Sequence, residues 1–242
     1  MSEAIKLRRF WDHVHLQEHE NGFQILLDTR PVKLPQKTVL HIKNKVLAQK
    51  IVKEWEQAGS KKGDVFSFEQ LPLTRMVGTM IEKIIPNRNM YVDVLIPYLN
   101  GDLLCYHADT PKQLVNKQQE YWLPLVHWFQ ERFSVQLITK TGIMPITQSP
   151  ITVQTVQNYL SNLTDGELTA FAVLVPLLGS IILTCAMKEN QINAKYAFEL
   201  AYLDETVQAE IWGYDSQQQG RLDKICKDIE EASEFLELIS NS

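Results

Sequence analysis

Four residues near the C-terminus have side chains that could act in catalysis or in binding: Asp204, Glu205, Gln208 and Trp212. Glu205, Gln208 and Trp212 follow the spacing i, i+3 and i+7, which places them on one side of a predicted helix. A carboxylate there could act as a general base, whereas a tryptophan beside a carboxylate and an amide could anchor a partner. The spacing alone favours a plainer interpretation, in which a core-covering helix carries a polar outer stripe.

The other reactive residues lack the neighbours that metal binding or catalysis requires. His13 and His15 share one face of a predicted strand, but no cysteine or carboxylate cluster completes a metal site. Cys105 precedes His107 by two positions without a third group, which favours a buried structural thiol over a nucleophile. Ser180 lies in a Gly-Ser-Ile sequence rather than in a nucleophile elbow, which indicates a small residue packed between helices. We therefore predict no metal site and no catalytic residue.

Nucleotides and nucleic acids are also unsupported as ligands. The ten glycines are scattered and form neither a Walker loop nor a dinucleotide fingerprint, so we predict no cofactor. The net charge of −5 argues against a general nucleic-acid binder. The stretch from Arg30 to Lys62 is basic but lacks interleaved aromatic residues, which indicates a solvated face or a complement to an acidic partner.

The longest apolar stretch, from Leu168 to Met187, contains no charged and no amide side chain. Its length of about 20 residues would suit a membrane span. However, Pro176 and Gly179 interrupt it, and the charges that flank it are mixed rather than clearly positive on one side. We therefore interpret it as the buried core helix of a helical domain, with a kink or a break at Pro176, and keep a membrane span as the alternative.

The N-terminal part has the pattern of short strands. Phe10–Leu16 and Phe23–Leu27 are strand-like, and Asn21-Gly22 between them is typical of a hairpin turn. Thr38–Ile42 is predicted to form a further short strand. These segments together indicate a small, mostly antiparallel sheet.

The apolar period then changes from that of a strand to that of a helix. Asn44–Ala58 is predicted to be an amphipathic helix, with Asn44 as its N-cap and Gly59 at its end. One helix on one face of a small sheet forms a stable two-layer unit. The Gly59–Gly63 segment is the best candidate for a linker after this unit.

The rest of the chain is mostly helical in pattern. The predicted helices are Leu73–Ile85, Met90–Leu99, Lys112–Phe133, Ile151–Leu163, the apolar stretch, Ala194–Trp212 and Ser216–Leu238. In the helix Ala194–Trp212, the apolar stripe comprises Leu200, Leu203, Val207 and Ile211. The fold class is therefore α+β: a small antiparallel β-rich N-terminal domain with a helix (residues 1–63), followed by a larger all-α helical domain (residues 64–242).

The cellular compartment is indicated by the cysteines and by the N-terminus. Three cysteines, far apart and odd in number, are typical of a reducing compartment. The first residues lack the apolar core of a signal peptide and are too acidic for a transit peptide. We expect a bacterial cytoplasmic protein, or a mitochondrial matrix protein if the source is eukaryotic.

A series of short motifs occurs in a fixed order along nearly the whole chain: Arg9-Phe10-Trp11, Gly22-Phe23, Leu27-Asp28-Thr29-Arg30-Pro31-Val32, Glu54-Trp55, Leu71-Pro72-Leu73-Thr74-Arg75, Gly101-Asp102-Leu103-Leu104-Cys105-Tyr106, Trp122-x-Pro124-x-x-x-Trp128, Gly142-Ile143-Met144-Pro145 and Leu203-Asp204-Glu205-x-x-Gln208-x-x-x-Trp212-Gly213. In this order the motifs resemble the ATP synthase assembly chaperones that act on the alpha subunit of the catalytic head, called assembly factor 2 in mitochondria. Each motif is weak alone, but their joint occurrence in order is specific.

The resemblance implies a two-domain fold without catalytic activity. It implies a chaperone that binds the free alpha subunit and prevents its aggregation until that subunit pairs with beta. The implied binding surface comprises Asp204, Glu205, Gln208 and Trp212, with Trp55 as a further contact, although the spacing of Trp55 from Leu47 and Ile51 also places it in the core.

Other partners and activities follow less directly from the sequence. We expect a monomer with no nucleic-acid partner and no membrane span. The alternative function is a soluble hydrolase-like enzyme that uses Glu205 or His107 as its general base.

Overall fold

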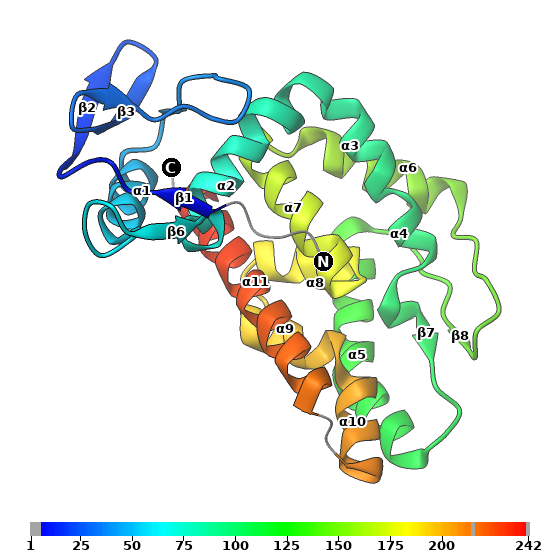
Figure 1. The fold of residues 1–242 in the computed structure, drawn as a ribbon. Helices are drawn as coiled ribbons and strands as arrows, with labels where there is room; N and C mark the ends of the chain where they lie inside the picture. Colours follow the sequence, from blue (N-terminus) through cyan, green and yellow to red (C-terminus); the bar gives the residue numbers. More distant parts are fainter. Residues whose placement is uncertain (1–5, 214–215, 241–242) are drawn as a thin grey trace. The chain divides into compact units, whose positions relative to one another are not determined.

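The computed structural model describes residues 6–213 and 216–240 of the chain and shows a small antiparallel sheet followed mostly by helices (Figure 1). The strands are β1 (Lys6–Arg8), β2 (Val14–His19), β3 (Gly22–Leu27), β4 (Arg30–Pro31), β5 (His41–Ile42), β6 (Val65–Ser67), β7 (Tyr106–His107) and β8 (Lys140–Thr141). The α-helices are α1 (Lys45–Gln57), α2 (Pro72–Thr79), α3 (Arg88–Leu95), α4 (Pro97–Asn100), α5 (Lys112–Phe133), α6 (Pro150–Asn162), α7 (Asp165–Leu178), α8 (Ile181–Lys188), α9 (Ala194–Ala201), α10 (Leu203–Trp212) and α11 (Ser216–Ser240). Single-turn segments of 3-10 or π type are η1 (Phe68–Gln70), η2 (Met80–Ile84), η3 (Ile85–Asn87) and η4 (Leu103–Cys105). The mixed α/β class agrees with the sequence pattern.

The chain divides into two compact units. Unit 1 comprises Met1–Asn87 together with Asp165–Thr169 and Glu234–Ser242. Unit 2 comprises Arg88–Thr164 and Ala170–Ser233. The border predicted after residue 63 therefore lies inside unit 1, which also takes in the beginning of α7 and the end of α11.

The segment after residue 63, expected to be entirely helical, contains three short strands. In unit 1, β6 pairs with β1 in an antiparallel two-stranded sheet. In unit 2, β7 and β8 form a parallel two-stranded pair. Each of these strands has only two or three residues, so none is long enough to show the alternation that identifies a strand in a sequence.

The predicted hairpin is present in unit 1. Strands β2 and β3 pair in antiparallel register from Val14 opposite Leu27 to His19 opposite Gly22. Gly22 has φ of +120°, and a Cβ atom there would lie 2.6 Å from the Ile42 carbonyl oxygen. Glycine is therefore required at this position, where β5 joins β3.

The first strand of the hairpin, β2, begins at Val14, later than the predicted Phe10–Leu16. One Asp28 carboxylate oxygen accepts hydrogen bonds from the backbone N–H groups of Asp12 (3.0 Å) and His13 (2.9 Å). These two N–H groups are thus hydrogen-bonded to a side chain rather than to a neighbouring strand. Trp11 is buried in the unit 1 core, edge-on to Trp55 at 5.3 Å between ring centroids.

The predicted helix after the sheet is confirmed as α1. The Asn44 side chain accepts from the Leu47 N–H at 2.9 Å, as an N-cap residue does. Leu47, Ile51 and Trp55 form its buried face, and α1 packs against β2 and β3. Gly59 follows the helix with φ of +62°.

Two motif side chains join α1 to its neighbours in unit 1. The Glu54 carboxylate accepts from the N–H groups of Leu73 (2.6 Å) and Thr74 (3.0 Å) and so caps the N-terminus of α2. Burial raises the pKa of Glu54, and these hydrogen bonds oppose the shift. Just beyond Glu54, at the C-terminal end of α1, the buried guanidinium of Arg9 donates to the carbonyls of Glu56 and Gly59 at 2.6 and 2.8 Å.

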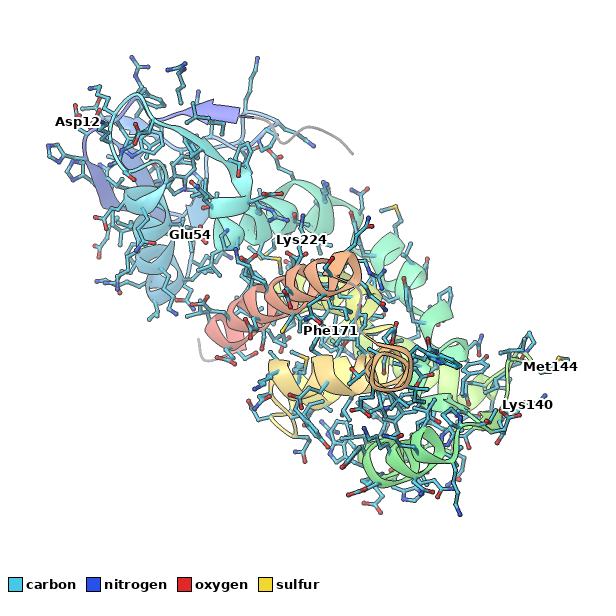
Figure 2. All side chains as sticks on the ribbon, turned by 60° about the horizontal axis from the view of Figure 1, so that its bottom comes forward. Asp12, Glu54, Lys140, Met144, Phe171 and Lys224 are labelled. Carbon is cyan, nitrogen blue, oxygen red and sulfur yellow. The ribbon has the colours of Figure 1, made fainter. Side chains whose placement is uncertain are left out.

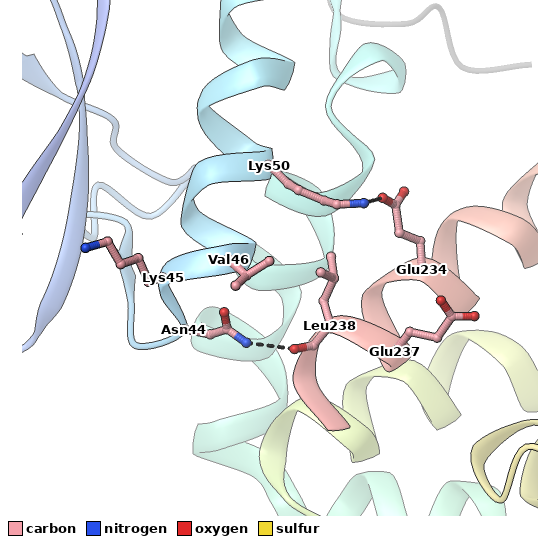
Figure 3. A pocket seen from close by; sticks show the side chains of 7 residues that line it. All are labelled: Asn44, Lys45, Val46, Lys50, Glu234, Glu237 and Leu238. Atoms are coloured by element: carbon pink, nitrogen blue, oxygen red, sulfur yellow. Dashed lines mark hydrogen bonds and ion pairs between the residues drawn. The ribbon is translucent and has the colours of Figure 1, made fainter. Parts of the chain in front are cut away.

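The C-terminal end of the chain also belongs to unit 1 (Figure 3). The Asn44 Nδ2 atom donates to the Leu238 carbonyl at 2.7 Å, and Lys50 forms an ion pair with Glu234. A cavity of about 420 Å³ lies between these contacts. These contacts link α1 to a segment almost 200 residues away in sequence.

The apolar stretch Leu168–Met187 forms two helices rather than one kinked helix. Pro176 lies inside α7, and the break follows at Gly179, which has φ of +61°. The Ser180 hydroxyl then accepts from the Leu183 N–H at 3.0 Å and caps α8. The predicted break at Pro176 is therefore wrong in position, because the left-handed glycine and the serine cap end one helix and begin the next.

Both helices are largely buried, as predicted. In unit 2, every residue of α8 from Ile181 to Met187 is buried, and Phe171 of α7 lies among the helices of that unit (Figure 2). Helix α8 packs against α5 and α9. Among the described residues, the structure contains no helix with the length and apolarity that crossing a membrane demands.

The Asp102 side chain is hydrogen-bonded to the N-terminus of α8. It is completely buried, and its carboxylate accepts from the Leu104 N–H (3.1 Å), the Ser180 hydroxyl (2.8 Å) and the Ile182 N–H (3.1 Å). It therefore caps both η4 and α8. Desolvation raises the pKa of Asp102 from 3.8 to about 6, against the opposing effect of its hydrogen bonds.

This raised pKa predicts a pH dependence of stability. The folded protein holds the Asp102 proton up to about pH 6, whereas the unfolded chain releases it near 3.8. The folded state binds more protons in this window, so the contribution of Asp102 to the free energy of unfolding falls by about 3 kcal/mol as the pH rises through it. Urea unfolding of the wild type and of Asp102→Asn across this range should show their difference shrinking with pH. A difference independent of pH would contradict the assignment.

Candidate functional site

The predicted helix Ala194–Trp212 is two helices, α9 and α10, separated at Tyr202. Tyr202 has φ of −111° and ψ of 25°, outside the helical range, and its hydroxyl donates to the Leu177 carbonyl at 2.8 Å. The apolar stripe gave no sign of this break because Leu200 and Leu203 are buried on both sides of it. The four C-terminal candidates therefore lie together on the ten-residue helix α10.

One side of α10 is fixed to α5. The Gln118 side chain, 1% exposed, accepts from the Ala108 N–H at 2.7 Å and donates to the Asp204 carboxylate at 3.0 Å. Burial raises the pKa of Asp204, and the hydrogen bond from Gln118 opposes the shift. Asp204 thus anchors the helix instead of pointing freely into solvent.

A second contact holds the C-terminal half of α10 on α5. The Glu210 carboxylate accepts from the Gln113 side chain at 2.8 Å and pairs with Lys117 at 3.2 Å. Val207, between Asp204 and Glu210, is completely buried. Polar contacts at both ends and an apolar contact between them set the orientation of the helix.

The outward side of α10 ends in exposed residues that we name the α10 tip: Gln208, Ile211 and Trp212. Trp212 is 85% exposed and Ile211 is 47% exposed, while Gln208 is also exposed. Ile211 was predicted to continue the buried stripe and does not, since that stripe ends at Val207. A large exposed tryptophan beside an exposed isoleucine is typical of a surface that binds a partner rather than of one that contacts only solvent.

Glu205 lies on the third side of α10, beside a shallow pocket. The pocket has a volume of about 220 Å³, and its other lining residues are Phe198, Thr206, Ala209, Gln218, Gln219 and Leu222. None of these side chains is a histidine, a second carboxylate or a cation. Within the described lining of this pocket, Glu205 therefore has none of the companion groups that general acid–base catalysis uses.

The surroundings of the other candidates predicted from the sequence indicate structural roles. His107 is half-buried, 3.1 Å from the Leu104 carbonyl oxygen through Nε2 and edge-on to Trp122. Cys105 is buried, and desolvation raises the pKa of its thiol, which keeps it unreactive. His13 and His15 have ring centroids 6.1 Å apart, and the described residues contain no group of three or more metal-ligating side chains.

Trp55 lies in the core of unit 1 and is 6% exposed. Its Nε1 atom donates to the Thr74 hydroxyl at 3.1 Å, and its ring packs edge-on against Phe66. Trp55 is therefore a core residue of unit 1, whereas the α10 tip belongs to unit 2.

A second exposed apolar motif lies on the loop that follows β8. Ile143 is 95% exposed, and Met144 projects with Lys140 away from the helices of unit 2 (Figure 2). The segment lies between the predicted helices Lys112–Phe133 and Ile151–Leu163. Since Gly142-Ile143-Met144-Pro145 is one of the ordered motifs, the loop offers another apolar group to solvent on the same unit as α10.

Comparison with known proteins decides the family. The chain matches the family described as ATP12 chaperone protein over residues 8–130. This protein belongs to the ATP12 chaperone family. The mitochondrial protein atp12 of Schizosaccharomyces pombe is 27% identical over 219 residues, which cover 85% of this chain and 74% of that protein.

Solved structures of an ATP12 protein agree with this assignment. The crystal structure of Atp12 from Paracoccus denitrificans matches with a TM-score of 0.89 and 33% identity, over 96% of this chain and 97% of that chain. A mutant of the same Paracoccus protein matches with a TM-score of 0.88 and 33% identity, with the same coverage. The predicted resemblance to ATP synthase assembly chaperones is confirmed, and the protein is not an enzyme. The hydrolase alternative with Glu205 or His107 as base is therefore wrong.

Several motifs of this ATP12 protein occupy structural joints. Arg9, Glu54 and Asp102 form hydrogen bonds at helix ends, and Gly22 permits the close approach of β5 to β3. The C-terminal motif Leu203–Gly213 differs, because its last side chains face solvent and lie beyond the matched residues 8–130. Sequence reasoning missed the role of Gln118, although an amide within the apolar stripe of a predicted helix is a signal of a buried hydrogen bond.

Proposed function

We propose that this ATP12 chaperone binds the free alpha subunit of the F-type ATP synthase catalytic head and prevents its aggregation until it pairs with beta. The order of the motifs along the chain supports this partner. The single observation that supports this binding site is the exposure of Trp212 on a helix whose opposite side is anchored to α5. Binding through a pre-positioned helix loses little conformational entropy.

The physical need for such a chaperone follows from the assembly of rings. A subunit outside its ring exposes apolar interfaces and strand edges that would otherwise be covered, and these surfaces aggregate. A chaperone that covers them transiently needs no ATP, because the authentic partner displaces it by forming a larger interface.

In this proposal, the partner contacts the α10 tip and Glu205, while Asp204 positions the helix. Trp212 and Ile211 supply apolar area, and Gln208 and Glu205 supply polar contacts around it. Trp55 contributes through the unit 1 core. The chaperone acts as a monomer where the alpha subunit is made or imported, in the bacterial cytoplasm or in the mitochondrial matrix.

Trp212→Ala tests the proposal. Because a central exposed tryptophan is typically worth about 2 kcal/mol or more in an interface, we expect roughly a thirtyfold weaker complex. Co-expression with the cognate alpha subunit should then leave most of that subunit in the insoluble fraction. The affinity of the purified pair gives the same result quantitatively.

Ile151→Ala is the matched control, since Ile151 is 76% exposed on α6 and lies outside every motif. The control variant should protect the alpha subunit as well as the wild type does. Both variants should keep the thermal stability of the wild type, because neither side chain is buried. If the Trp212 variant protects the alpha subunit as well as the wild type does, the α10 tip is not part of the interface. If the alpha subunit aggregates even with the wild-type chaperone present, it is not the partner.

A further inference from the structure

A second surface of the protein, on unit 1, has the form of a peptide-binding groove. Its volume is about 610 Å³, and its floor includes the aromatic residues Phe10, Trp11, Phe66 and Phe68. Trp11 and Phe66 are buried and packed edge-on at 5.5 Å, which makes the floor rigid. Phe10 is 48% exposed, so part of the aromatic surface is accessible to a ligand.

The charged residues that line this groove are all cations: Arg8, Arg30 and Lys33. All three are exposed. Arg30 lies over the Phe10 ring at 5.8 Å, and Arg8 donates to the Gly63 carbonyl at 3.3 Å. No ion pair joins any of the three to another residue within 6–213 or 216–240. The groove therefore offers positive charge that the described part of the chain does not neutralise.

The two walls of the groove come from strands at sheet edges. Leu7 and Arg8 belong to β1, which pairs with β6 alone as far as the described residues show. Arg30 and Pro31 belong to β4, which pairs with β3 and leads into Val32, whose carbonyl accepts from the Leu40 N–H at 3.0 Å. Edge strands are the places where an extended peptide adds to a protein, with its alternate side chains directed into pockets. The unpaired edge of β1 thus favours an extended ligand over a helical one.

A neighbouring cavity of about 320 Å³ on the same unit shares part of the lining of the groove. The two share Val32, Lys33, Trp55 and Phe68. The second cavity adds the cations Arg75 and Lys83 and one acid, Glu82, whose carboxylate accepts from the Gln36 N–H at 2.9 Å. Five cations and one acid therefore line the groove and this adjacent cavity, which we together name the trough.

We propose that this trough binds an extended segment of a client protein in which apolar or aromatic side chains stand next to carboxylates. Apolar side chains bury against the aromatic floor, and carboxylates pair with Arg30, Lys33 and Arg8 at the rim. Arginine pairs bidentately with carboxylates, which adds orientation to attraction. The segment is acidic and apolar by charge complementarity, and only the identity of the client rests on the function proposed above.

The test measures peptide binding by the intact chaperone without any alpha subunit. A short fluorescein-labelled peptide that alternates phenylalanine or leucine with aspartate is titrated by fluorescence anisotropy. The double variant Arg30→Glu with Lys33→Glu should bind it at least tenfold more weakly than the wild type. Phe10→Ser, which removes exposed floor instead of charge, should also weaken binding several-fold.

Matched controls separate the groove from the net charge. Lys53→Glu with Lys61→Glu makes the same change of net charge at exposed positions of unit 1 outside the trough and should leave the affinity unchanged. A peptide with lysine in place of aspartate should not bind. Added salt should weaken the wild-type complex, because the rim charges are exposed.

The proposal is overturned if the Arg30 and Lys33 reversal binds the acidic peptide as tightly as the wild type does. It is also overturned if the wild type fails to bind the peptide. If the same reversal then abolishes self-association, the groove is an interface between two copies. If the chaperone does not protect the alpha subunit but still binds the peptide, the alpha subunit is not the client, and the proposed peptide-binding groove stands. The two proposals therefore fail in distinguishable ways.

Discussion

Replacing Asp102 with alanine is expected to lower the free energy of unfolding by about 3–5 kcal/mol at neutral pH. The substitution leaves the Leu104 and Ile182 N–H groups and the Ser180 hydroxyl without their acceptor in a site with no access to solvent. Each buried donor without a partner costs about 1–3 kcal/mol. The loss falls on α8, which is buried along its length and is therefore central to unit 2.

Urea unfolding monitored by circular dichroism measures this effect. Asp102→Asn keeps the volume and one acceptor, so it should lose less stability than Asp102→Ala. Ser180→Ala removes the cap of α8 and one donor to Asp102, and should cost about 1–2 kcal/mol. A loss below 1 kcal/mol for Asp102→Ala would mean that water replaces the carboxylate and that the site is less closed than its burial indicates.

Local sequence patterns predicted the elements that depend on neighbours in the chain. The Asn44 cap and the His19–Gly22 hairpin turn were both predictable, because each depends on residues within one turn of each other. The buried apolar helices were predictable for the same reason. Length and apolarity alone are sufficient to require burial.

Joints between distant segments were not predictable from local patterns. Arg9 resembles any surface arginine in the sequence, but it bonds carbonyls about 50 residues away at the end of α1. The contact between Asn44 and Leu238 similarly brings the end of α11 into unit 1. Such contacts depend on the path of the chain, which periodicity does not encode. A border drawn at the linker-like Gly59–Gly63 segment could not include them.

The candidate site was predicted in its residues but not in their roles. Periodicity extended the buried stripe to Ile211, whereas α5 covers α10 only as far as Val207 and the Glu210 contact. Whether a residue in an apolar stripe is buried depends on where the covering helix ends. The apolar residues of α10 beyond that point are the ones available to a partner.

Gln118→Glu is expected to loosen α10 from α5 by about 2–3 kcal/mol at neutral pH and to reduce protection of the alpha subunit. The new carboxylate would still accept from the Ala108 N–H, but it would face the half-buried Asp204 carboxylate where an amide donates now. Two like charges in a partly buried site repel, and one must take up a proton or move into solvent. Because Asp204 sets the orientation of α10, the α10 tip should lose its fixed position.

Adding Asp204→Asn to Gln118→Glu should restore what the single substitution removes. The pair then has the same hydrogen bond with donor and acceptor exchanged, and the charge count of the wild type. Double-mutant analysis of unfolding free energies and of alpha subunit affinity should give a favourable coupling of about 2 kcal/mol or more. If the double variant regains stability without affinity, Asp204 contacts the partner directly. If it regains both, the role of Asp204 is to position the helix, and the surface that the partner recognises is Glu205 with the α10 tip.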